Sequence, residues 1–149
     1  MTVIKKENWL LDLNLRLLIY LFILYMYIDY RKTTLAILFS IIIIGLIAIP
    51  LGNPKFIYRA IGLELSFIIL SVFLWKGYTQ ALYACIPISL LVIIGNTLAP
   101  PHVNLMLTFS KPLNAIVLIV GGYILQVLLI FFSIKYLSEI RSKRISKQL

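Results

Sequence analysis

The residue with the clearest capacity for chemistry in this 149-residue chain is Glu64, the one acidic side chain deep inside an apolar stretch. It follows Phe56 by eight residues. In a helix that starts there, it lies about 12 Å along the axis, near the middle of a membrane that the helix crosses. A charge at that depth costs on the order of 3 kcal/mol, and ionisable residues retained there handle protons or ions by default. Glu64 therefore indicates a proton or cation site. The alternative is a neutral carboxyl that joins helices by hydrogen bonding.

Polar side chains in the other apolar stretches are the candidate neighbours of this carboxyl. They are Tyr20, Ser89, Asn96, Tyr123 and Gln126. We expect the protonated carboxyl to hydrogen-bond to the hydroxyl of Tyr20, Ser89 or Tyr123, which fall at a similar depth. If Glu64 titrates, Asn96 and Gln126 line the same pathway, together with Ser89.

The remaining side chains exclude most enzymatic and metal chemistry. His102 is the only histidine and Cys85 the only cysteine, so the chain cannot by itself form a zinc site, a haem site with two histidines or a disulfide. The acidic residues are too scattered for paired-carboxylate catalysis, at positions 7, 12, 29, 64 and 139. The sequence therefore predicts a protein that is not an enzyme and has no catalytic residues, no metal and no cofactor.

The elements that position these residues follow from the distribution of charge. Residues 33–54, 77–110 and 112–134 contain no Asp, Glu, Lys or Arg, and each run exceeds the roughly 20 residues that a membrane-crossing helix needs. This predicts an all-α, polytopic transmembrane bundle in a single domain with about five spans and short loops. The spans are expected at roughly 9–30, 34–51, 56–75, 79–99 and 113–136, followed by a basic tail at 137–149. Four spans remain if the first segment lies on the membrane surface.

Small and polar residues predict which faces of these spans pack together. In lipid, helices associate through close backbone approach at small residues and through hydrogen bonds between polar ones. At 100° per residue, such positions share one face in each of three spans. They are Ala60, Glu64 and Ser71 in the third span, Ala81, Cys85, Ser89 and Asn96 in the fourth, and Gly122, Gln126 and Ser133 in the fifth. The second span is rich in isoleucine and leucine and is expected to be a peripheral, lipid-facing helix.

The net charge of +9 lies mostly between or beyond the apolar runs, where it faces lipid headgroups rather than nucleic acid. With five spans the two termini lie on opposite faces. When Arg16 and Arg59 inside the spans are left out, four basic residues fall on the N-terminal face and eight on the other. The four are Lys5, Lys6, Lys55 and Lys111, and the eight are Arg31, Lys32, Lys76, Lys135, Arg141, Lys143, Arg144 and Lys147. The excess of positive charge favours a cytoplasmic C-terminus. We expect a multi-pass protein of a cell or organelle membrane.

Two functions fit these patterns. The first is a non-catalytic accessory or structural subunit of a larger respiratory, secretion or transport complex, because the chain is small and offers several small-residue faces. Its partners are the lipid bilayer and other membrane-protein subunits, with no nucleic acid. The second is a small transporter or proton-linked carrier, as a homo-oligomer or alone, that uses Glu64 as an intramembrane protonation site.

Overall fold

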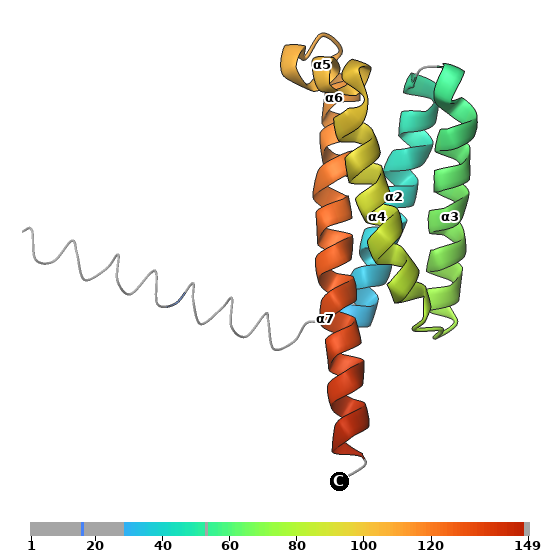
Figure 1. The fold of residues 1–149 in the computed structure, drawn as a ribbon, viewed down its shortest axis with the longest axis vertical. Coiled ribbons are helices and arrows are strands. Elements are labelled where there is room, and N and C mark those ends of the chain that lie inside the picture. Colours follow the sequence, from blue (N-terminus) through green and yellow to red (C-terminus); the bar gives the residue numbers. More distant parts are fainter. Residues whose placement is uncertain (1–15, 17–28, 53, 148–149) are drawn as a thin grey trace, which may run out of the picture.

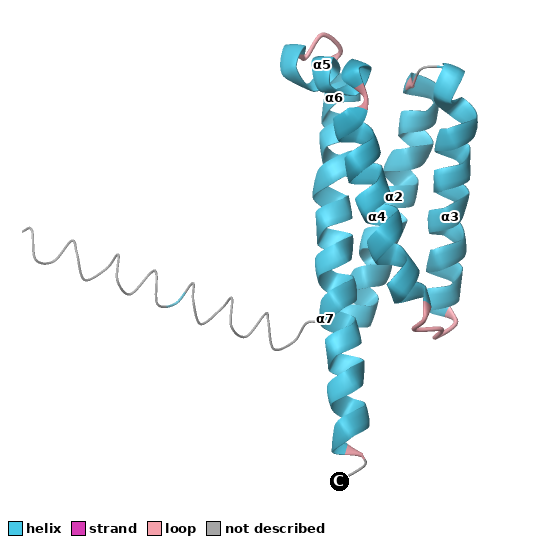
Figure 2. Ribbon diagram, in the orientation of Figure 1, coloured by secondary structure: helices cyan, strands magenta, loops and turns pink. Residues whose placement is uncertain are grey.

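The computed structural model describes residue 16 and residues 29–52 and 54–147, and within them every regular element is helical (Figure 2). In chain order the elements are α2 (Tyr30–Leu51), the 3₁₀ turn η1 (Pro54–Phe56), α3 (Ile57–Trp75), α4 (Ala81–Leu98), α5 (Pro100–Thr108), α6 (Pro112–Ile119), the π-helical turn η2 (Val120–Ile124) and α7 (Leu125–Ser146). The expected first span, at 9–30, lies almost wholly outside the described residues.

Four helical segments are long and apolar enough to cross a membrane: Tyr30–Leu51, Ile57–Trp75, Ala81–Leu98 and the continuous rod Pro112–Ser146. This confirms the predicted all-α transmembrane class and describes a multi-pass membrane protein. The helices stand side by side, α5 lies across one end of the bundle, and α7 continues past the other end towards the C-terminus (Figure 1). Residues 137–146, expected as a tail, are the last turns of α7, and Glu139 pairs with Lys143 on their surface.

The expectation that the second span is peripheral is wrong. Helix α2 packs against both α3 and α7, and Thr34, Ile37, Leu38 and Ile41 are buried along it. Isoleucine and leucine fill a protein core as readily as they face lipid, so a helix that is apolar all round carries no signal for its packed face. The core cluster joins this face to Phe67, Leu70 and Leu74 of α3, Ala81, Leu82 and Cys85 of α4, and Leu129 of α7.

The connection between the fourth and last spans contains a helix that the sequence patterns did not indicate. Helix α5 begins with Pro100 and Pro101 at its first positions, where a missing backbone N–H costs no hydrogen bond. It ends at Phe109, whose φ of 48° and ψ of 29° are left-handed, and Pro112 starts α6 in the same way. These prolines therefore mark the starts of two helices.

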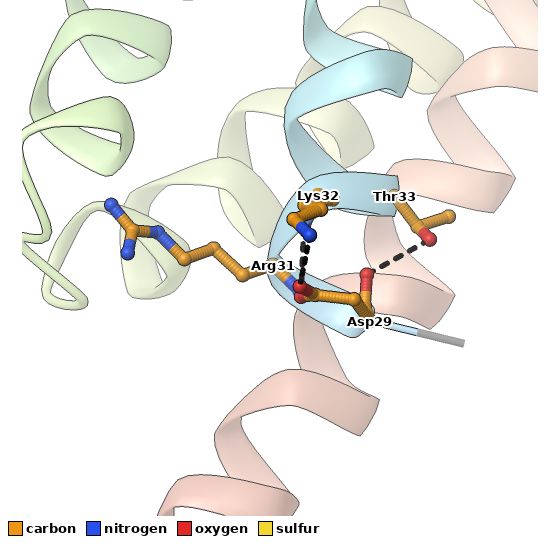
Figure 3. A network of polar contacts seen from close by, with 4 residues as sticks. All are labelled: Asp29, Arg31, Lys32 and Thr33. Atoms are coloured by element: carbon orange, nitrogen blue, oxygen red, sulfur yellow. Dashed lines mark hydrogen bonds and ion pairs between the residues drawn. The ribbon is translucent and has the colours of Figure 1, made fainter. Parts of the chain in front are cut away.

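Asp29 caps the N-terminus of α2 (Figure 3). Its Oδ1 accepts hydrogen bonds from the backbone N–H groups of Arg31 at 3.1 Å and Lys32 at 3.2 Å. The Arg31 side chain points the other way and donates to the carbonyl of Trp75 at 2.7 Å, where α3 ends. One short segment thus satisfies both the free N–H groups at the start of α2 and a free carbonyl at the end of α3.

Replacing Asp29 by Ala is expected to destabilise the bundle by about 1 kcal/mol, the usual cost of losing such a cap. The backbone N–H of Lys32 lowers the pKa of Asp29. The stabilisation is therefore present above the ordinary carboxyl pKa and is lost as the pH falls through the lowered value. Since 48% of the side chain is exposed, solvent screening reduces the charge contribution. Thermal unfolding in detergent, followed by circular dichroism at neutral and acidic pH, measures both effects. Asp29→Asn keeps an acceptor and should recover most of the stability at neutral pH, and an equal loss in both variants would contradict the capping role.

Candidate functional site: a cavity between the helices

A cavity of about 650 Å³ lies at the end of the bundle that carries α5, opposite the C-terminus (Figure 1). The second half of α2, the first half of α3, the end of α4, and α5, α6 and η2 contribute its walls. Most of the lining is aliphatic. The polar lining residues are Glu64, Asn96, His102, Ser110, Lys111, Asn114 and Gln126.

Glu64 is the buried carboxyl of this cavity, with 7% of the residue exposed. Its Oε1 atom has no hydrogen-bond partner among the described residues. The carboxyl lies against Gly45 of α2, where a Cβ atom would overlap Oε1, Oε2 and the carboxyl carbon. Gly45 therefore provides the space that the carboxyl occupies, a role that the sequence analysis missed.

The hydrogen bonds expected for Glu64 are not formed within the described residues. Ser89 is buried with its own hydroxyl unpaired, and it is not among the residues that line the cavity. The Tyr123 hydroxyl lies 3.3 Å from Thr97 Oγ1. The third candidate, Tyr20, lies outside the described residues. The expectation for Ser89 and Tyr123 is thus wrong, because equal depth in neighbouring helices does not place two side chains on facing sides.

The π-helical turn η2 forms part of the cavity wall. The backbone N–H of Leu125 bonds to the carbonyl of Val120, five residues back, and so leaves the Gly121 carbonyl free of its usual helical partner. The Gln126 side chain fills that role, since its Nε2 donates to Gly121 O at 2.9 Å. Gln126 is 1% exposed and its Oε1 has no partner among the described residues. The wider turn therefore fixes the orientation of a buried amide.

A chain of hydrogen bonds ties α5 to η2 through Asn96. Asn96 Nδ2 donates to the Gly122 carbonyl at 3.5 Å, so its Oδ1 accepts, and His102 Nδ1 lies 3.1 Å from that oxygen. Nδ1 of the ring must then carry the hydrogen. Burial lowers the pKa of His102, which favours the neutral ring. The sequence did not indicate this hydrogen bond between His102 and Asn96.

The other residues that the sequence singled out have packing roles. Ser71, Ala81, Cys85 and Gly122 are buried, and Ala60 lines the cavity near its entrance beside Ile57 and Phe56. Asn114, which the sequence analysis did not select, donates from Nδ2 to the Leu51 carbonyl at 3.0 Å and fastens α6 to the end of α2. Of the predicted polar set, the cavity therefore brings together Glu64, Asn96 and Gln126.

The arrangement is suited to binding. Among the described residues no group of three His, Cys, Asp or Glu side chains could hold a metal ion. The titratable side chains among the described lining residues are Glu64, His102 and the exposed Lys111. No protein-family model, curated protein or solved structure matched this chain. The function must therefore be argued from the cavity itself.

Gly122→Ala is expected to move the pKa of His102 up towards its ordinary value. The added Cβ would overlap Asn96 Nδ2, so the amide must turn away and release the ring, which then becomes more hydrated. Because the chain has one histidine, a nuclear magnetic resonance titration of its ring protons reports on this site alone. Gly95→Ala serves as the control, since nothing lies within 4 Å of its added Cβ. Equal titration curves in the two variants would contradict the hydrogen-bond chain.

Proposed function

We propose that the protein is a small proton-linked carrier in which Glu64 is the intramembrane protonation site. The observation that supports this proposal is a buried carboxyl on the wall of a cavity of about 650 Å³, with its Oε1 unpaired among the described residues. A carboxyl that only joins helices would have its buried oxygen satisfied by a neighbour, because an unpaired buried acceptor costs about 1–3 kcal/mol. A carboxyl that lines a cavity and has no such hydrogen bond on this oxygen is instead suited to bind a proton or a substrate cation.

Coupling follows from the use of one group by two cations. A carboxyl that holds a proton cannot at the same time form an ion pair with a cationic substrate, so binding of one favours release of the other. No second carboxylate among the described lining residues could take over either role. A single acidic side chain thus provides the minimum needed for exchange of a proton against a substrate.

The charge distribution supports an orientation for this carrier. Lys32, Lys76 and the basic end of α7 lie at the end of the bundle opposite the cavity. By the positive-inside rule that end is cytoplasmic. We therefore place the C-terminus in the cytoplasm and the cavity in the outer half of the membrane.

The test uses the full-length protein in liposomes that contain a pH-sensitive dye. Amines, inorganic cations and weak acids are added in turn, and proton flux is recorded for wild type, Glu64→Gln and Glu139→Gln. The proposal expects flux with at least one of these compounds in wild type and Glu139→Gln, and background flux in Glu64→Gln. Absence of flux with every compound, or flux that survives in Glu64→Gln, would overturn it.

The accessory-subunit function remains the second candidate because of the outer face of α3. Nothing lies within 4 Å of a Cβ built on Gly62, and Ser66 follows one turn later. A small residue at this spacing on a lipid-facing surface allows a neighbouring transmembrane helix to approach closely. Purification in mild detergent tests this candidate: stoichiometric co-purifying subunits, retained with Glu64→Gln, would support it over the carrier.

A further inference from the structure

We propose that the cavity takes a protonated primary or secondary amine with an apolar body, and that its ammonium group takes the place of the proton on Glu64. This inference rests on the proposed carrier function and names the class of its substrate. Three features of the cavity support it: the donors and acceptors that remain free, the nature of the walls, and the charges that face Glu64.

Two amide groups of the cavity each donate one hydrogen bond within the protein. Gln126 Nε2 and Asn96 Nδ2 both point to backbone carbonyls, of Gly121 and Gly122. A carbonyl can only accept, so these contacts fix which end of each amide is nitrogen. Gln126 Oε1 is left buried without a partner among the described residues, like Glu64 Oε1. Two of the residues that line the cavity therefore each have a buried oxygen without a partner among the described residues.

The other polar groups of the lining do not reverse this balance. Asn114 Nδ2 is engaged by the Leu51 carbonyl. His102 uses its Nδ1–H towards Asn96 Oδ1, and the neutral ring then offers Nε2 as a further acceptor. Lys111 carries donors, but it is exposed. A ligand that satisfies the buried groups must accordingly bring N–H or O–H donors of its own.

The aliphatic and aromatic walls of the cavity favour a ligand that also has an apolar body. Ile41 and Ile44 of α2, Phe67 of α3, Val92 of α4 and Leu118 of α6 line the cavity. Burial of apolar surface against such side chains gives about 25 cal/mol per Å² of favourable free energy, and the aromatic ring of Phe67 also suits a cation. A volume of about 650 Å³ falls within the range of small-molecule sites, roughly 300–1,000 Å³.

The charges that face Glu64 select a cation over an anion. Helix α2 contributes only uncharged lining residues, and α4 and α7 contribute the amides of Asn96 and Gln126. Among the described lining residues, the other titratable ones are His102 of α5 and Lys111 between α5 and α6. An anion placed beside Glu64 would meet the oxygens of the carboxyl, whereas an ammonium group can donate hydrogen bonds to them.

The exchange replaces one proton on Glu64 by one ammonium ion, so that charge and atoms balance. An ammonium ion from water enters the cavity while Glu64 carries a proton, and the carboxyl O–H bond breaks. The ammonium keeps its own N–H bonds and pairs with the carboxylate. The displaced proton leaves to water, so one proton is released for each amine bound.

The test measures binding to the full-length protein in lipid nanodiscs, with three probes of matched shape. These are 4-phenylbutylamine, the neutral 4-phenylbutanol, and the N,N,N-trimethyl derivative of the amine, which keeps the charge and has no N–H donor. We expect the amine to bind wild type and Glu139→Gln with release of about one proton. The alcohol should release none, and the trimethyl derivative should bind about tenfold or more weakly than the amine, because charged N–H donors are lost to bare acceptors. Glu64→Gln and Gly45→Ala should lose specific binding of the amine.

Infrared spectra of the Glu64 carboxyl, assigned by their loss in Glu64→Gln, separate the two proposals. If the carboxyl takes up and releases protons but the amine neither binds nor releases a proton, the amine inference is overturned and the protonation site stands. Equal affinities for the amine and the alcohol would likewise overturn the amine inference. If the carboxyl does not change protonation at any pH, both proposals fail. Should Glu64→Gln not fold, the comparison of Gly45→Ala with Gly62→Ala decides the outcome, since the three atoms nearest to the Gly45 substitution all belong to the Glu64 carboxyl.

Discussion

Glu64→Gln is expected to reduce substrate-dependent proton flux in proteoliposomes to the level of protein-free liposomes. The amide has nearly the size of the carboxyl and fits the same space beside Gly45, so the bundle should assemble. It cannot lose or gain a proton in the accessible pH range, and it cannot form an ion pair. Both halves of the proposed exchange are therefore removed by the change of one atom.

The control for this variant is Glu139→Gln, which makes the same chemical change in the last turns of α7. Glu139 pairs with Lys143 on the surface of the helix, and exposed pairs of this kind contribute little to stability. Its flux should equal that of wild type. If the role of Glu64 is purely structural, Glu64→Gln should keep its function, because an amide still donates and accepts hydrogen bonds.

The class of fold could be predicted because its cause is local. Runs such as 77–110 lack every strongly charged residue, and no soluble fold of this size needs so much continuous apolar sequence. The bounds of individual helices are less local. Pro100 and Pro101 follow the end of one helix and start the next, and proline is compatible with either role.

The site was predictable in part: the sequence indicates how deep a side chain lies in the membrane, but not towards which neighbouring helix it points. Glu64 stood out because a carboxyl within a span is costly wherever its neighbours lie, and Asn96 and Gln126 share its cavity. Ser89 was placed at a similar depth, yet it is packed away from the cavity. The rotation of one helix relative to another is set by tertiary packing, which the periodicity of a single helix does not contain.

The packing of α2 could not be predicted for the same reason. Its only glycine in the membrane-spanning part, Gly45, meets Glu64, and its Ile44 meets Gly121, where an added Cβ would come within 2.7 Å of the Ile44 Cγ2 atom. Two glycines on different helices thus allow α2 to approach α3 and η2 closely. Such pairings depend on the register between helices, so a uniformly apolar sequence conceals them.

Gly45→Ala is expected to reduce proton-linked flux by about tenfold or more while leaving the fold intact. The added methyl group would overlap the Glu64 carboxyl, to which the three nearest atoms all belong. The end of a flexible side chain can move aside at little cost, and alanine also favours the helix by about 0.5–1 kcal/mol over glycine. The unfolding temperature of Gly45→Ala should therefore change little. The Glu64 carboxyl, however, is displaced from its position in the cavity wall.

Gly62→Ala provides the matched comparison on α3, since its added Cβ meets nothing within 4 Å. It gains the same helix propensity and should keep wild-type flux. The decisive measurement pairs flux with the infrared carboxyl bands of Glu64, which should shift in Gly45→Ala and stay in place in Gly62→Ala. A Gly45→Ala variant with shifted bands and full flux would show that transport does not pass by this carboxyl, even though the carboxyl is buried beside the cavity. The proposal expects lost flux, a shifted carboxyl band and an unchanged unfolding temperature in Gly45→Ala. This combination would show that transport depends on the position of Oε1 and Oε2 of Glu64, because the substitution displaces this carboxyl while the bundle stays folded.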